Sequence, residues 1–345
     1  MPIRSISPSR PPLPAAAAYG RLLAVTAVLF GPDMGGAAAE FARLLGAENA
    51  HWPQPPGNSS APSIIVASAW LLWMVRRRHG ARTRWAGGLS AAALLAGAVL
   101  APLTASIAEA VGVVLLTVVG GALALAVIVD AGMAPSALGF IPAKGRRGRR
   151  RPTPLTSREG AAQAGMALSV SLAGFLVTDV LENWLWSLPW PRMTESQGQV
   201  LDLHGAVQYA ANVLAAGARE EVPLLALPVV LLTAARRPAW EIYAVACTLR
   251  ITPHLYFGFP ALAVAAFTCT HVWIFQRTRR AEPIIAGHTL SNALAAYAPA
   301  AALVTLAASA APAALVLLSG RLGRPPRLGT HVNTTARPTE KEGAA

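Results

Sequence analysis

Apolar residues along this chain are grouped into long segments, and shorter polar stretches separate them. A transmembrane α-helix needs about 20 predominantly apolar residues to cross the hydrocarbon core of a bilayer. Ten segments approach that length: residues 16–32, 60–75, 85–105, 108–131, 161–181, 204–235, 239–258, 260–276, 283–299 and 301–319. Because lipid cannot satisfy unpaired backbone groups, segments of this kind are expected to be helical. The pattern predicts an all-α, polytopic membrane bundle of about ten transmembrane helices, with a range of eight to ten.

The first segment has two interpretations, and both stay open at this stage. It is rich in alanine, and Arg21 lies inside it. In the first interpretation it spans the membrane, and Arg21 extends its charged end toward the headgroups. In the second it is a cleaved signal peptide.

The composition agrees with a membrane protein and excludes several other classes. Of the 345 residues, 54% are hydrophobic and only 13% are charged, whereas a soluble domain carries about 25% charged residues. Disorder over most of the chain is excluded, because it requires low hydrophobicity and high charge. The two cysteines, Cys247 and Cys269, lie inside apolar segments. They are predicted to be small buried side chains, and a disulfide framework is excluded.

The chain carries a net charge of +13, but the placement of the basic residues argues against nucleic acid as a partner. They form short clusters between apolar segments, which is typical of cytoplasmic loops. With the N-terminus inside, ten alternating spans place every arginine cluster on the same side, so both termini are predicted to be cytoplasmic. These inner stretches are residues 76–84, 132–160, 236–238, 277–282 and 320–345. The outer loops 33–59 and 182–203 then carry more acidic than basic residues.

The longest polar stretch inside the chain suggests how the protein is divided. Residues 1–133 form an N-terminal membrane part with about four spans, and residues 134–158 form a basic cytoplasmic loop. Residues 159–320 form a second part with about six spans. The tail, residues 321–345, is polar and is predicted to be disordered.

Ionisable side chains inside membrane spans are energetically expensive and therefore indicate functional sites. They are concentrated in the second part of the chain, at Glu220, Glu221, Arg250, His254, His271, His288 and Asn292. The pairs Arg250/His254 and His288/Asn292 are each four residues apart, so each pair shares one helix face. Adjacent glutamates point to different faces, so only one is expected to enter a given site. His271 stands alone in its segment and is predicted to be a hydrogen-bonded packing residue.

Two chemistries fit these residue types, and the spacing alone does not choose between them. In the first, Glu220 activates a water molecule together with His254 and returns the proton to a leaving amine. His288 and Asn292 would then stabilise the oxyanion, and Glu221 would support the site. In the second, Glu220, His254 and His288 are three ligands of a catalytic zinc ion, with water as the fourth.

The order of these residues resembles the CPBP family, the CAAX-processing and bacteriocin-processing (Abi-like) intramembrane proteases. The family pattern is EExxxR, then FxxxH, then HxxxN or HxxxD. Glu220-Glu221 match the first motif, His254 the second, and His288 with Asn292 the third. The stretch 250–258, Arg-Ile-Thr-Pro-His-Leu-Tyr-Phe-Gly, also looks like a form that is common in actinobacterial-type members. The resemblance covers roughly residues 160–300.

The chain departs from the family pattern at two positions. The motif arginine would be residue 225, which is Leu225, and the motif phenylalanine would precede His254 by four, at Arg250. One interpretation is that the charge has changed its position in the sequence, so that Arg250 or Arg219 holds a glutamate in place of the missing arginine. In that case, replacing Arg250 with leucine should abolish function.

The resemblance implies an intramembrane endopeptidase of the CAAX prenyl endopeptidase type, integral to a bacterial plasma membrane. Its partners would be the lipid bilayer and a membrane-associated peptide or protein substrate. Family members are described both as zinc metalloproteases and as metal-free glutamate proteases. Two other functions stay open: an inactive scaffold or immunity-type protein with the same fold, and a proton-coupled transporter, since Glu and His also form proton relays.

Overall fold

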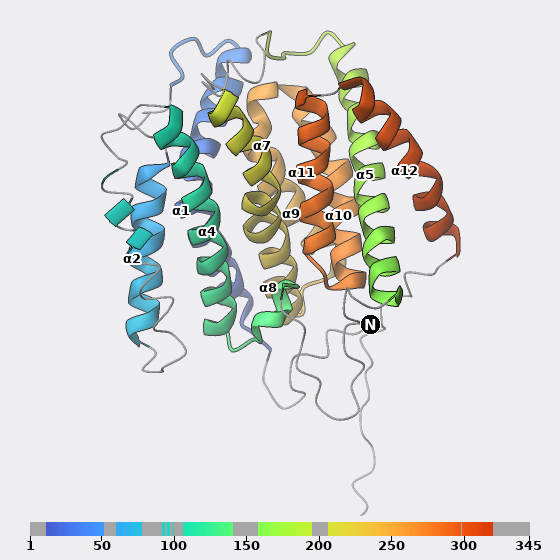
Figure 1. Ribbon diagram of the computed structural model, residues 1–345. Helices are drawn as coiled ribbons and strands as arrows, with labels where there is room; N and C mark the ends of the chain where they lie inside the picture. Colours follow the sequence, from blue (N-terminus) through green and yellow to red (C-terminus); the bar gives the residue numbers. More distant parts are fainter. Residues whose placement is uncertain are drawn as a thin grey trace, which may run out of the picture.

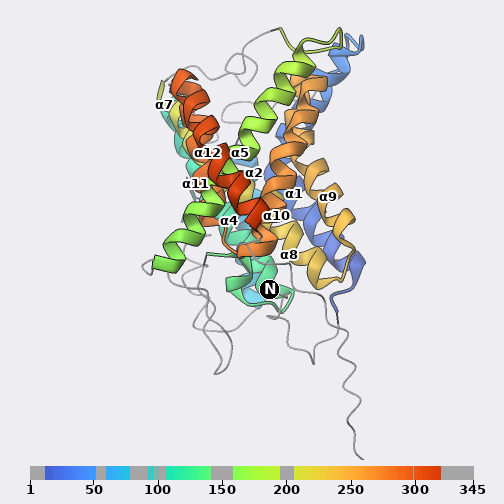
Figure 2. The same cartoon turned by 90° about the vertical axis from the view of Figure 1, so that its right-hand side faces the viewer.

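The computed structural model describes residues 12–51, 60–77, 92–93, 95–96, 99, 106–140, 158–194, 206–297 and 299–319. Throughout these residues the regular structure is helical, and the only β-type pairing is an isolated bridge between Arg192 and Gly258. Figures 1 and 2 show the helices running side by side as an elongated bundle. The predicted all-α fold is therefore confirmed for the described part of the chain.

The helices follow the apolar segments closely. The long ones are α1 (Ala15–Leu44), α2 (Ala61–Arg77), α4 (Ser106–Asp130), α5 (Arg158–Trp186), α7 (Ala206–Glu220), α8 (Leu227–Ala234), α9 (Ala239–Ile251), α10 (Val264–Thr278), α11 (Glu282–Tyr297) and α12 (Pro299–Ser319). Shorter turns connect some of them: η2 (Pro135–Leu138), η3 (Glu221–Ala226), η4 (Thr252–Phe257) and η5 (Phe259–Ala263). Nine of the ten predicted segments thus fall on helical elements. Most of the segment 85–105, most of the loop 134–158 and the whole tail 321–345 lie outside the described residues.

Four helical segments are long and apolar enough to cross a membrane. They are Ala15–Leu44, Glu109–Asp130, Gly160–Trp186 and Phe259–Thr278, and Val304–Leu315 is a shorter apolar helix. The described residues therefore show fewer qualifying spans than the ten predicted. Two predicted segments are interrupted, 204–235 by a π-helical turn and 239–258 by a 3₁₀ turn, so neither provides one long continuous helix.

Helix α1 differs from the prediction, because it continues through residues 33–44, which were expected to form an outer loop. Asp33 lies on this helix and forms an ion pair with Arg219 on α7. Arg21 does not depend on the headgroups for a partner, since its Nη2 lies 3.1 Å from Asp130 Oδ2 on α4. The same helix contributes Leu22 and Phe30 to the buried core. The ion pairs of Arg21 and Asp33 therefore fix α1 against the rest of the bundle.

Two sets of contacts define the two ends of the bundle. At one end the backbone N–H of Leu13 donates to the carbonyl of Ala234 (3.2 Å), and Gly139 lies against the backbone of Arg279. At the other end the rings of Phe41 and Phe259 are 5.6 Å apart. The start of α1 and the ends of α8 and α10 therefore share one end. Arg236, Arg237, Arg279 and Arg280 adjoin those two helix ends.

A large apolar core joins helices from before and after residues 134–158. It contains Val25 of α1, Leu123 of α4, Leu231 of α8 and Phe275 of α10, all fully buried. A second, smaller cluster contains Phe175 and Phe267, whose rings stack at 4.7 Å. This second cluster borders the polar site described below.

The contact between α7 and α11 depends on a glycine, and this gives a first prediction. A Cβ atom on Gly217 would overlap Thr289 and the backbone carbonyl of Ile285 on α11. Gly217→Ala is expected to lower the free energy of unfolding by about 1–3 kcal/mol, because a packed interface tolerates an added methyl group poorly. Gly20 on α1 has open space where a Cβ atom would lie, with no neighbouring atom within 4 Å. Gly20→Ala should raise stability by up to about 1 kcal/mol, since alanine is the better helix former. Thermal unfolding in detergent micelles measures both, and equal shifts would contradict the proposed close contact.

Candidate functional site

The two adjacent glutamates lie at an irregular turn between α7 and α8. Helix α7 ends at Glu220, and Glu221 begins the six-residue π-helix η3, all of which is buried. Pro223 has no N–H to donate and its ring would collide with the carbonyl four residues earlier in a regular α-helix. A wider π turn relieves this conflict, and such turns are frequent at functional sites. The sequence of this segment therefore favours a local change of helix geometry at the glutamates.

This turn changes the expected orientation of the glutamates. Oε2 of Glu220 lies 3.5 Å from Nη2 of Arg250, and Oε1 of Glu221 lies 3.1 Å from the same nitrogen. The expectation that only one of the two would enter the site is therefore wrong. The reason is that the chain passes from α to π geometry between them, so their side chains converge on one guanidinium.

Glu221 is the centre of the hydrogen-bond network. Its Oε1 accepts hydrogen bonds from Arg250 Nη2 at 3.1 Å, His271 Nδ1 at 3.1 Å and His288 Nδ1 at 2.8 Å. A carboxylate can only accept, so both histidines carry a proton on Nδ1. In their neutral forms their Nε2 atoms are then acceptors. The 3.4 Å approach of Arg250 to His288 Nδ1 consequently brings two donors together and is no hydrogen bond.

Arg250 is the cation that both carboxylates share. It is fully buried on α9, and its guanidinium lies 4.7 Å from the ring centre of Phe267. Leu225, at the position of the arginine in the EExxxR pattern, is 1% exposed in the apolar core and makes no charge contact. Of the two arginines considered as a replacement, Arg219 pairs with Asp33, and Arg250 is the one that reaches both glutamates.

His254 is held by the end of α9. This helix ends at Ile251, and the 3₁₀ turn η4 follows it. The last carbonyls of a helix have no partner within the helix, and His254 Nδ1 donates to one of them, the carbonyl of Arg250, at 2.7 Å. Because a carbonyl can only accept, Nε2 of a neutral His254 is an acceptor. This half-buried ring therefore has a lone pair for a water molecule.

Glu220 is the more accessible of the two carboxylates. Its side chain is 16% exposed, against 1% for Glu221. Its Oε2 accepts no hydrogen bond from the described residues. Glu220 thus retains capacity to accept a hydrogen bond, whereas Oε1 of Glu221 is fully used.

Helix α11 carries the third predicted pair. His288 is 4% exposed and contacts Glu221. Asn292 follows one turn later and is half-buried. Residues four apart lie on the same helix face, so Asn292 is on the side of α11 that faces the carboxylates.

His271 was predicted to be a hydrogen-bonded packing residue. It is buried and hydrogen-bonded, as predicted, but the prediction did not place it against Glu221. One feature of the sequence could have indicated this contact. His271 lies eight residues before Arg279, and His288 lies seven residues after Ala281. Two helices joined by a short turn place such residues at similar depth, because each residue rises about 1.5 Å along the axis.

The predicted zinc set was Glu220, His254 and His288. Within the described ranges there is no group of three or more His, Cys, Asp or Glu side chains that could hold a metal ion. His288 uses Nδ1 for Glu221 and His254 uses Nδ1 for a carbonyl. These two bonds leave Nε2 of each ring as an acceptor, which is also how zinc-bound histidines are held, so they argue neither for nor against the metal. The mechanism proposed below uses protein groups alone.

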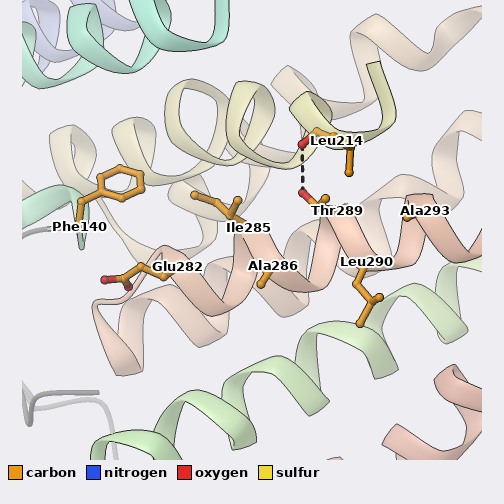
Figure 3. Close-up of a pocket in the computed structure, with 8 residues that line it drawn as sticks. All are labelled: Phe140, Leu214, Glu282, Ile285, Ala286, Thr289, Leu290 and Ala293. Atoms are coloured by element: carbon orange, nitrogen blue, oxygen red, sulfur yellow. Dashed lines mark hydrogen bonds between the residues drawn. The ribbon is translucent and has the colours of Figure 1, made fainter. Parts of the chain in front are cut away.

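An apolar groove lies on a different face of α11, and it is separate from the polar cluster. Its volume is about 590 Å³, and Figure 3 shows it between α7 and α11. One polar contact crosses it, from the Thr289 hydroxyl to the carbonyl of Leu214 at 3.4 Å. None of the glutamates, histidines or Arg250 of the cluster lines this groove. It therefore contributes none of the groups of the cluster, and the ionisable side chain that lines it is Glu282.

Comparison with known proteins adds no further information on identity. The chain matches no protein-family model, no curated protein and no solved structure. What the fold and the site define is a class: an all-helical protein with membrane-type helices. Its described part contains a buried cluster of two carboxylates, one guanidinium and two imidazoles.

Proposed function

We propose that this protein is an intramembrane endopeptidase that hydrolyses a peptide bond in a membrane-associated substrate, as the resemblance to the CPBP family implies. The observation that carries this proposal is the convergence of Glu220, Glu221, Arg250 and His288 in a buried site. Buried charges of this kind are energetically expensive, and their presence therefore indicates a functional site. The family motifs and the geometry point to the same residues.

The chemical step assigns two acceptors of the buried site to one water molecule. Oε2 of Glu220 and Nε2 of His254 would each accept a hydrogen bond from it. Glu220 removes a proton as the water oxygen attacks the scissile carbonyl, which forms a tetrahedral oxyanion. The same carboxyl group then gives the proton to the leaving amine, and the C–N bond breaks. Arg250 holds Glu220 in place for both transfers.

The oxyanion requires donors, and His288 with Asn292 would provide them. Nδ1 of His288 is bonded to Glu221, so this ring donates from Nε2 only as an imidazolium ion. Two carboxylates against one guanidinium leave one negative charge, and a proton on His288 would balance it. The Asn292 amide supplies an uncharged donor one turn away. Preorganised donors of this type stabilise a developing oxyanion by several kcal/mol, about 2.7–4 for one donor.

The topology belongs to the same proposal. We infer about ten spans, with both termini in the cytoplasm of a bacterial cell and the chain integral to its plasma membrane. The support is the arginines that adjoin the helix ends at one end of the bundle, as the positive-inside rule requires. Cysteine labelling with a membrane-impermeant reagent at Gly46 and Ala235 variants would test the two sides separately.

A cleavage assay tests the function. The full-length protein in bilayer nanodiscs should release fluorescence from a quenched library of apolar peptides. No release from any peptide, together with pH-driven uptake of protons or solutes into proteoliposomes, would favour the transporter. The absence of both activities would favour the scaffold.

Chelation distinguishes the two catalytic chemistries. Cleavage should continue unchanged in the presence of EDTA and phenanthroline, because the proposed mechanism uses Glu220 and His254 without a metal ion. Added zinc should have no effect on the rate. Loss of activity in chelator, followed by recovery in zinc, would contradict this mechanism and support the set Glu220, His254 and His288 as zinc ligands.

A further inference from the structure

A serine that belongs to none of the sequence motifs forms a hydrogen bond with the buried cluster. Ser171 on α5 is 0% exposed, and its Oγ lies 2.7 Å from Nε2 of His271 on α10. Gly287 on α11 lies so close that a Cβ atom there would overlap the Ser171 side chain. Three helices therefore enclose this one hydroxyl group, and the small size of Gly287 is what allows them to approach.

The direction of the hydrogen bonds follows from the groups involved. Glu221 can only accept, so His271 carries its proton on Nδ1 and its Nε2 has a lone pair. The Ser171 hydroxyl must then be the donor to Nε2. The result is a linear chain of two hydrogen bonds, from Ser171 to His271 and from His271 to Glu221.

The order serine, histidine, carboxylate is also that of hydrolytic triads, in which the serine is the nucleophile. The enclosure of Ser171 argues against that role here. Its side chain has no exposed surface, and it does not line the groove beside α11. An acyl group on Oγ would have to occupy the space that Gly287 leaves only for the hydroxyl itself.

We propose that Ser171 is a positioning residue that acts through His271, and that its hydroxyl holds the His271 ring so that Nδ1–H points at Glu221. Without this donor the ring can turn, and Nδ1–H is no longer held toward the Glu221 carboxylate. Glu221 would then lose one of its three hydrogen-bond donors, and Arg250 would interact more with Glu221 and less with Glu220. Glu220 would be held less firmly as a consequence. This consequence for catalysis rests on the proposed function, whereas the role of Ser171 in holding the His271 ring does not.

Nitrogen-15 NMR of histidine-labelled, full-length protein in bicelles tests this hydrogen bond directly, with a His271→Asn variant identifying the signal. Wild-type protein should show His271 protonated at Nδ1, with its Nε2 lone pair hydrogen-bonded. Ser171→Ala should move the Nε2 signal toward that of a lone pair without a hydrogen bond, and Ser171→Cys, a weaker donor of similar size, should lie between the two. Ser68→Ala is the matched control, because Ser68 is also 0% exposed but its Oγ has no partner among the described residues.

Peptide cleavage provides the second measurement. Ser171→Ala should lower kcat by about tenfold, the effect of losing one buried hydrogen bond, and should leave KM unchanged. An unchanged His271 signal in Ser171→Ala would overturn the proposal even if the wild type cleaves peptides. A shifted signal with no cleavage by any variant would instead overturn the proposed function and leave the positioning role intact. Covalent labelling of Ser171 by a fluorophosphonate would overturn the positioning role in favour of a nucleophile.

Discussion

Replacing Glu220 with glutamine should abolish most peptide cleavage and leave the fold intact. Glutamine has the same size and keeps one carbonyl oxygen, but it cannot take a proton from water. General acid–base groups contribute about 10²–10⁴-fold to rates, so kcat should fall by that factor. The expected change in stability is small, because Glu220 is 16% exposed and Arg250 retains its closer partner, Glu221, at 3.1 Å. Kinetics with the best library peptide and thermal unfolding on the same sample measure the two effects.

A second carboxylate provides the control for this experiment. Glu40 lies on α1 and pairs with Arg43 at the exposed surface. Glu40→Gln removes one charge of the same kind, and it should change neither kcat nor the unfolding temperature appreciably. If Glu220→Gln cleaved at the wild-type rate, then Glu220 would not be the base, and the catalytic assignment of this site would have to be abandoned.

The apolar pattern predicted the helices well, because each helix must present apolar side chains to lipid or to its neighbours. It failed at the points where backbone geometry changes. The π turn at Glu221 depends on Pro223 and on packing around it, and a periodicity analysis that assumes an α-helix places adjacent residues on different faces. Helix α1 continues past Pro32, and Asp33 in that continuation pairs with Arg219 on α7. No local signal in residues 33–44 indicates that contact.

In the candidate site, too, the sequence predicted which residues share a helix face, but it did not predict which helices pack together. Pairs four residues apart identified Arg250 with His254 and His288 with Asn292, because a helix fixes that relationship. The partners of these pairs come from other helices, and their order along the chain gives no distance. His271 was assigned to packing because no other polar candidate lies one turn away on its own helix. It nevertheless forms a hydrogen bond with Glu221 as directly as His288 does. Ser171 looks like any small residue in an apolar span until α10 is placed against α5.

The second large effect should come from removing the buried cation. Arg250→Met deletes the guanidinium and leaves two carboxylates, Glu220 and Glu221, in a site with no compensating arginine. Breaking a buried ion pair by removing one partner is expected to lower the free energy of unfolding by about 3–5 kcal/mol. The exposed pair of Arg43 with Glu40 is the control. Arg43 is 52% exposed, so Arg43→Met should change stability by about 1 kcal/mol or less.

A double-variant cycle separates the charge effect from the loss of packing around Arg250. Glu221→Gln removes one negative charge and keeps an oxygen that His271 and His288 can still reach. If the cost of Arg250→Met comes from unpaired carboxylates, then adding Glu221→Gln should recover about 1–3 kcal/mol of the loss, within the range of coupling energies for residues in contact. Unfolding free energies of the wild type, both single variants and the double variant give this coupling. Strictly additive losses would show that Arg250 acts as a packing residue against Phe267, and that the shared guanidinium does not hold the two glutamates together.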